Sequence, residues 1–251
     1  MYRFLSFLLL FLIVSIAYFF QNNSNLIEKK NELSLIIPLY SYPTLWNSSM
    51  HNNLNYLNNK FKKTIVIINP NNGPGKYRNP DYVNGIKYLN NNNIKVLGYI
   101  YTKYTKRKLF KVYHDLELYK DNYGDLNLKG IFFDEISLSS KEDLDYLTKI
   151  IKYAHDLGFS FIAINPGIKL NQEFIDLELF DLVISFEDSF ENYNIKDIKV
   201  KESKKTKHAL LIYNLKEKIS FDKIKNQGFD YFYLTEDSLP NPWDTLYKIE
   251  S

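Results

Sequence analysis

Short apolar runs recur eight times along the chain, each followed by a polar loop and then a stretch with helical character. The runs are apolar at consecutive positions, as in parallel strands whose two faces are both buried. We therefore predict eight strands, over Leu35–Leu39, Thr64–Ile68, Lys95–Tyr101, Gly130–Phe133, Phe159–Ile164, Leu182–Phe186, Ala209–Tyr213 and Tyr231–Leu234.

The segments between these runs have the periodicity and end signals of helices. In segment 141–157, apolar residues recur at three- and four-residue spacing, which gives one apolar side. Ser140 with Asp143 precedes it in a capping-box-like arrangement, and Gly158 ends it. Pro80 suits the first turn of a helix over 81–92. Other helical segments are expected at 107–120 and 216–227, with weaker ones near 171–178 and 190–200.

Strands alternating with helices predict an α/β fold class built from parallel βαβ units with right-handed crossovers. Eight units favour a single closed (β/α)8 TIM barrel over residues 34–251, and the 251-residue length is ordinary for one. An open doubly wound sheet is the alternative, although no Gly-rich fingerprint follows the first strand.

The N-terminal residues form a different kind of segment. Arg3 precedes an apolar run from Phe4 to Phe20 that only Ser6 and Ser15 interrupt. A positive residue before such a run is typical of a secretory signal or an uncleaved signal anchor, and we favour the anchor. Residues 1–20 are therefore predicted to be that signal or anchor and 21–33 a polar linker. Either version places the barrel outside the cytoplasm, tethered to a membrane or secreted.

Composition narrows the possible functions. The net charge is only +3, and the Lys and Arg residues are interspersed with Asp and Glu, so nucleic-acid binding is not expected. The absence of cysteine excludes disulfides, thiolate metal sites and cysteine nucleophiles. The four His residues lack metal-ligand spacing, and neither a Gly-x-Ser-x-Gly elbow nor a Gly-x-x-x-x-Gly-Lys loop occurs. We expect a monomer that needs no metal and no other cofactor.

Polar residues gather where the predicted strands end, which is where barrel enzymes have their active sites. Asp134 and Glu135 follow the fourth strand, and Glu187 follows the sixth. Glycosidic cleavage requires a carboxylic acid to protonate the leaving oxygen and a second carboxylate as nucleophile, base or charge stabiliser. These three acids are therefore the predicted catalytic set. Any one of them could instead cap a helix or be a solvated loop acid.

The same strand ends carry residues suited to binding a sugar. Tyrosine rings offer stacking faces and hydroxyls, and Asn side chains offer both donors and acceptors to sugar hydroxyl or acetamido groups. The predicted substrate-binding residues are Tyr40, Tyr42, Asn69, Tyr99, Tyr101, Asn165 and Tyr213. For Trp46 and Trp243, a core or loop-anchoring role is favoured over a place in the site.

Six short blocks resemble the signatures of the spherulin-4 family, in the same order over residues 36–190. They are Pro38-Leu39-Tyr40-x-Tyr42-Pro43, Ile68-Asn69-Pro70-Asn71-x-Gly73-Pro74-Gly75, Leu97-Gly98-Tyr99, Gly130-Ile131-Phe132-Phe133-Asp134-Glu135, Asn165-Pro166-Gly167 and Phe186-Glu187. In the block at 102–107, Thr105 replaces a glycine that is usual in the family.

The resemblance implies a (β/α)8 glycoside hydrolase that cuts α-1,4-linked N-acetylgalactosamine in a secreted exopolysaccharide from within the chain. It also implies that Asp134, Glu135 and Glu187 are the catalytic acids. Which one is the acid stays open at this point, as does the stereochemical outcome. A separation of ~5 Å between the carboxyls would favour retention, and ~6.5–9.5 Å inversion. A non-catalytic polysaccharide-binding barrel and a purely structural exported domain are the alternative functions.

Overall fold

The computed structural model describes residues 32–46, 48–196, 198–201 and 203–246. The predicted signal or anchor (1–20) and almost all of the predicted linker (21–33) lie outside these residues. Within the described ranges, no helix combines the length and apolar character needed to cross a membrane.

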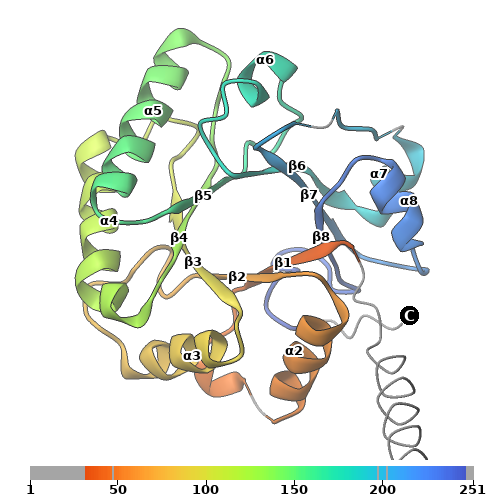
Figure 1. Ribbon diagram of the computed structural model, residues 1–251, viewed down its shortest axis with the longest axis horizontal. Helices are drawn as coiled ribbons and strands as arrows, with labels where there is room; N and C mark the ends of the chain where they lie inside the picture. The colour runs from red at the N-terminus through yellow and green to blue at the C-terminus, as the bar shows by residue number, and fades with distance from the viewer. Residues whose placement is uncertain (1–31, 47, 197, 202, 247–251) are drawn as a thin grey trace, which may run out of the picture.

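Eight parallel strands form a closed barrel in which each strand pairs with the next and β8 pairs with β1 (Figure 1). This closure confirms the predicted barrel and excludes the open doubly wound sheet. The strands are β1 (Ser34–Leu39), β2 (Thr64–Ile68), β3 (Lys95–Tyr101), β4 (Gly130–Asp134), β5 (Phe161–Ile164), β6 (Leu182–Ser189), β7 (Lys207–Tyr213) and β8 (Tyr231–Leu234).

Helices surround the barrel, with α4 packed beside α5 on one side (Figure 1). The α-helices are α2 (Ser48–Lys60), α3 (Pro80–Asn91), α4 (Leu109–Tyr123), α5 (Lys141–Asp156), α6 (Gln172–Ile175), α7 (Phe190–Ile195) and α8 (Phe221–Asn226). Two 3-10 helices, η1 (Pro43–Leu45) and η2 (Gly124–Leu126), complete the described elements.

The ends of the helices follow the sequence signals. Pro80 occupies the first turn of α3, and the Asn79 side chain accepts a hydrogen bond from the Asp81 amide at 2.9 Å. The Ser140 hydroxyl accepts one from the Asp143 amide at 3.1 Å at the start of α5. The Asp143 carboxylate accepts from the amide of Ser139, so the capping box is displaced by one residue.

Some predicted bounds were wrong. The fifth strand begins at Phe161 because the Phe159 amide still bonds back to the last turns of α5. The sixth strand continues to Ser189, because polar residues extend its pairing with β7 past the apolar run. Helices predicted at 107–120 and 216–227 begin at Leu109 and Phe221 instead.

Candidate active site

Asp134 ends β4 with its side chain directed to the barrel axis. In the pairing of β3 with β4, Tyr99 is opposite Phe132 and Tyr101 is opposite Asp134, so these positions share one face of the sheet. The Tyr99 hydroxyl donates to the Asp134 Oδ2 at 2.9 Å. Tyr40, which directly follows β1, packs edge-on against Tyr99 with ring centroids 5.6 Å apart. Strands β1, β3 and β4 thus bring two tyrosines and one carboxylate together.

Glu187 reaches the same interior because β6 contains a bulge. Ile184 pairs with Ala209 of β7, and the register then shifts so that Glu187 pairs with Leu211. Ala209 and Leu211 lie on one face of their strand, so Ile184 and Glu187 share a face although they are three residues apart. The residue left over in the bulge is Ser185, whose hydroxyl lies 2.7 Å from the His208 Nδ1. A regular strand would have turned Glu187 toward the helices.

Asn165, at the end of β5, connects the two carboxylates. Its Nδ2 donates to the Glu187 Oε2 at 2.6 Å, and its amide group also hydrogen-bonds the Asp134 carboxyl. The Asn165 Oδ1 accepts from the Gly167 amide at 3.0 Å, which orients the NH2 group toward the acids. Because β5 lies between β4 and β6, Asn165 is placed to hold both acids at the rim.

The environment of this pair favours protonation. Burial, followed by the nearby charge of Asp134, raises the pKa of Glu187 to about 7, although Asn165 and Trp243 hydrogen-bond its carboxyl. Burial likewise raises the pKa of Asp134, against the stabilising hydrogen bonds from Tyr99 and the Glu135 amide. Two buried neighbouring carboxyls do not ionise independently, so this pair retains a proton to a higher pH than solvated acids do.

Glu135 lies at the edge of this cluster in a strained conformation. Its φ of +54° is in the left-handed region, which non-glycine residues adopt mainly where surrounding contacts enforce it. Here the Glu135 carbonyl accepts from the Thr102 hydroxyl and from the Tyr104 amide, each at 2.6 Å. Its charge contributes to the raised pKa of Asp134 and Tyr99, so its carboxylate lies near both.

The loop after β3 shows how Thr105 is accommodated, where the family resemblance led us to expect glycine. Lys103, Tyr104 and Thr105 all have positive φ, a conformation that glycine adopts at lower cost. The Thr105 hydroxyl donates to the Asp143 carboxylate at the start of α5. Burial alone would raise the pKa of Asp143, but hydrogen bonds from Thr105 and Ser139, among others, hold it below its usual range. The side-chain hydrogen bond of Thr105 to Asp143 thus offsets the strain of its positive φ.

Not every predicted substrate-binding residue lies at the acids. Tyr42 is 38 % exposed, and its hydroxyl donates to the Asp81 carboxylate at 2.7 Å, at the start of α3. The Asn69 Oδ1 is occupied by the Gly73 amide at 2.9 Å, within the loop after β2. The Tyr101 ring is covered by the Arg107 guanidinium, 4.3 Å from its centroid. By contrast, Tyr40, Tyr99 and Asn165 contact the acid cluster, and the charge of Glu187 acts on Tyr213.

Sequence reasoning missed Trp243, which follows the last strand. Its side chain hydrogen-bonds Glu187, and its ring meets Tyr213 edge-on with centroids 6.2 Å apart. Its carbonyl accepts from the Tyr40 amide at 3.0 Å. No sequence signal marks this residue, since only closure of the barrel brings the segment after β8 back across β1.

A cavity of about 530 Å³ lies beside Glu187. It opens between the loop after β5, at Gly167–Lys169, and the segment after α7, at Lys196 and Ile198. Phe186 and Asp188 of β6 line it as well. A molecule in this cavity would therefore lie against Glu187, the acid whose pKa is about 7.

Comparison with known proteins supports this fold. A family model described as Spherulation-specific family 4 matches residues 34–249. The chain is 32 % identical over 167 residues to Spherulin-4 of Physarum polycephalum, and the match covers 64 % of this chain. It covers 46 % of that protein, so the chain spans about half the length of this relative.

Two solved structures share the architecture. Aspergillus clavatus Sph3, solved in complex with GalNAc, has a TM-score of 0.69 at 22 % identity, over 85 % of this chain and 92 % of that one. The Bacillus cereus spore cortex-lytic enzyme SleL has a TM-score of 0.51 at 9 % identity, over 88 % of this chain and 76 % of that one. At these identities, the similarity establishes a shared fold.

Proposed function

This chain belongs to the spherulin-4 family (spherulation-specific family 4), and from that premise we propose that it is a glycoside hydrolase. We propose as its substrate a polysaccharide containing α-1,4-linked N-acetylgalactosamine, cut within the chain. The relative Sph3 was solved with GalNAc, which supports an amino sugar as the recognised unit.

One observation supports hydrolysis most directly: Asp134 and Glu187 extend from different strands to a single buried asparagine, and their pKa values are raised. Glycoside hydrolases need one protonated and one ionised carboxyl on either side of the scissile bond. Near neutral pH, a buried Asp beside a Glu with a pKa of about 7 provides one protonated and one ionised carboxyl.

The roles follow from these protonation states. Glu187 is the general acid, because its raised pKa keeps a proton available for the leaving glycosidic oxygen. Asp134 is the ionised partner that acts as nucleophile, as base for water or as stabiliser of positive charge on the sugar ring. Glu135, held at the rim by its carbonyl contacts, positions the substrate. Tyr40, Tyr99, Asn165, Tyr213 and Trp243 surround the bound sugar.

Export of the barrel to its substrate is proposed to depend on residues 1–20. The apolar run after Arg3 would direct the barrel out of the cytoplasm and tether it to the membrane if uncleaved. Such a location suits an enzyme whose substrate is an extracellular polymer.

The proposed function is tested by incubating the protein with partly acetylated α-1,4-galactosamine polymer and reading product sizes by mass spectrometry. A ladder of oligosaccharides is expected from the start of the reaction, because an endo-acting enzyme cuts at internal bonds. Only monosaccharide would contradict the endo mode. Binding to the polymer without any product would instead support a barrel that only recognises polysaccharide.

The raised pKa of Glu187 predicts the alkaline side of the pH profile. The general acid works protonated, so kcat/KM should fall about tenfold per pH unit once the pH exceeds the pKa of about 7. Initial rates at low substrate concentration measure this in the free enzyme. If kcat/KM instead rises through the same range, Glu187 acts ionised, and its assignment as the acid is wrong.

A further inference from the structure

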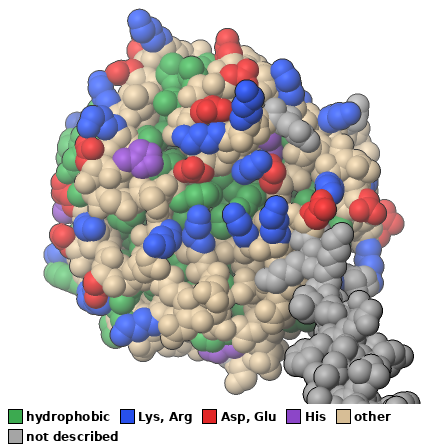
Figure 2. Space-filling model, viewed as in Figure 1, with side chains coloured by type: hydrophobic (Ala, Val, Ile, Leu, Met, Phe, Trp, Pro, Cys, Tyr) green, Lys and Arg blue, Asp and Glu red, His purple; other side chains and the backbone are tan. Residues whose placement is uncertain are grey.

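Cationic side chains cluster at the end of the barrel opposite the acids. In Figure 1, consecutive strands follow one another clockwise, which for right-handed crossovers places the N-terminal ends of the strands toward the viewer. Figure 2 shows this same face, where a row of Lys or Arg side chains lies beside an apolar area. The proposed active site therefore opens on the far side.

Four lysines at neighbouring strand starts can be assigned to this face, and we call them the lysine rim. Lys62 and Lys63 directly precede β2, Lys95 begins β3, and Lys129 directly precedes β4. Among the described residues, none of the four forms an ion pair. Burial, followed by repulsion from Lys63 and Lys129, lowers the pKa of Lys95, with only Asp181 opposing it. The rim is thus a local excess of positive charge.

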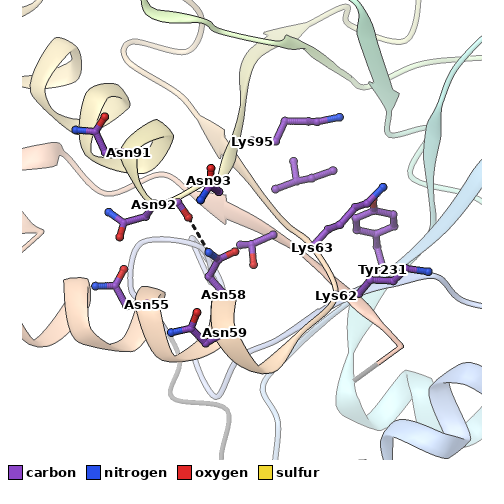
Figure 3. Close-up of a pocket in the computed structure, with 12 residues that line it drawn as sticks. Asn55, Asn58, Asn59, Lys62, Lys63, Asn91, Asn92, Asn93, Lys95 and Tyr231 are labelled. Atoms are coloured by element: carbon purple, nitrogen blue, oxygen red, sulfur yellow. Dashed lines mark hydrogen bonds between the residues drawn. The ribbon is translucent and has the colours of Figure 1, made fainter. Parts of the chain in front are cut away.

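The rim borders a hollow of about 580 Å³ that contains no acid (Figure 3). Lys62, Lys63 and Lys95 line it, with amide side chains from the ends of α2 and α3. The Thr64 hydroxyl, also in its lining, is buried without a hydrogen-bond partner. Ammonium, amide and hydroxyl groups together form a donor-rich surface of the kind that binds phosphate oxygens.

Helix dipoles do not explain this distribution of charge. All barrel helices end at this face, and their free carbonyls favour nearby cations. The other side of the same face nevertheless carries Asp181 before β6 and Asp230 before β8, and Lys207 is paired with Asp230 at 3.3 Å. By contrast, none of the four rim lysines on the arc from β2 to β4 is paired with a carboxylate in the part of the chain that the structure describes.

The chain enters the barrel beside this rim. The Leu33 carbonyl accepts from the Lys62 amide at 3.0 Å, and β1 begins at Ser34. Segment 21–33 connects that point to the apolar run 4–20, and even fully extended it spans no more than ~45 Å. If the apolar run lies in a bilayer, the lysine rim is within reach of the headgroups, and contact of the rim with them would turn the site with Asp134 and Glu187 away from the membrane.

We propose that the lysine rim, Lys62, Lys63, Lys95 and Lys129, is a docking surface for the anionic phospholipid headgroups of the membrane to which residues 4–20 tether this chain. The proposal rests on that tether and not on the catalytic assignment. An anionic membrane surface attracts basic side chains held close to it, so a tethered barrel would be oriented by its most basic face. Docking would fix the barrel with its active site directed at extracellular polymer.

The test uses full-length protein in vesicles of phosphatidylcholine, with or without phosphatidylglycerol. Because the chain has no cysteine, Asn59→Cys at the hollow and Tyr77→Cys at the opposite end each provide one site for a fluorophore. A quencher attached to lipid headgroups reports proximity. Quenching at position 59 is expected to rise with phosphatidylglycerol and to fall with added salt, while quenching at 77 stays low.

A triple variant of the exposed rim lysines, Lys62→Gln, Lys63→Gln and Lys129→Gln, should abolish this rise. Each lysine near an anionic surface contributes about fivefold, so the docking equilibrium should drop on the order of a hundredfold. The matched control, Lys108→Gln with Lys111→Gln and Lys141→Gln, removes the same charge elsewhere and should leave docking intact. Equal quenching at 59 in both lipids, or equal loss in both triple variants, would overturn the proposal. Flotation with phosphatidylcholine alone tests the tether separately.

Discussion

Replacing Glu187 by Gln is expected to remove hydrolysis while raising stability at alkaline pH. The amide keeps the size and can still accept the hydrogen bond from Asn165, but it has no proton to give the leaving oxygen. Loss of a general acid typically costs about a thousandfold in kcat. The loss is measured by comparing turnover of the α-1,4-galactosamine polymer with binding to the same polymer. Turnover should fall, and binding should persist.

The gain in stability follows from the raised pKa. The folded protein holds a proton on Glu187 up to about pH 7, whereas in the unfolded chain the carboxyl titrates near 4.5. As the pH rises between these values, the carboxyl ionises freely in the unfolded chain but not in the buried site, which destabilises the wild type by about 3 kcal/mol at most. The uncharged glutamine avoids this cost, so the variant should melt higher above pH ~7 and equal the wild type below pH ~4.5.

These two measurements separate a catalytic role from a structural one. A variant that is inactive and less stable at every pH would mean that Glu187 supports the fold, contrary to the proposal. Asp134→Asn is the companion variant, and it should also lose turnover while it retains the Tyr99 and Asn165 contacts.

Replacing Gly130 by Ala is expected to cause the largest loss of stability of any small substitution in the barrel. A Cβ at Gly130 would lie 1.8 Å from the Phe161 carbonyl oxygen, and that oxygen belongs to the backbone of the neighbouring strand β5. Neither strand can move without breaking its pairing. Overpacking usually costs about 1–3 kcal/mol, and we expect at least about 3 kcal/mol here because backbone must shift.

Thermal unfolding measures this loss, which should lower the melting temperature by roughly 10 °C for a protein of this size. Gly124→Ala is the matched control. A Cβ there would meet only the flexible Lys120 side chain, at 2.9 Å, and the backbone is already helical. Similar melting temperatures for the Gly130 and Gly124 variants would contradict the steric argument.

The sequence by itself determined the eight strands and located the candidate site along the chain. Eight continuous apolar runs that alternate with helical segments bury both faces as parallel strands, so the strands and the α/β class follow from local pattern. The pairing of β8 with β1 then decided for a closed barrel over an open sheet. Because the carboxyl ends of such strands meet at one rim, Asp134 and Glu187 could be selected before their geometry was known.

Tertiary structure decided which polar residues serve the acids. Tyr42 and Asn69 follow strands as Tyr40 and Asn165 do, yet their polar groups are taken by Asp81 and by the loop after β2. Trp243 reaches Glu187 only because the closed barrel returns the chain end to β1.

The orientation and the protonation state of the acids could likewise not be predicted from the sequence pattern. Glu187 faces the interior because of a bulge at Ser185, and its pKa depends on burial and on the distance to Asp134. The lysine rim was equally hidden, since lysines from 62 to 129 become neighbours only when β2, β3 and β4 pair. Periodicity specifies faces and order, whereas contacts between segments distant in the chain depend on register, and register is fixed only by packing.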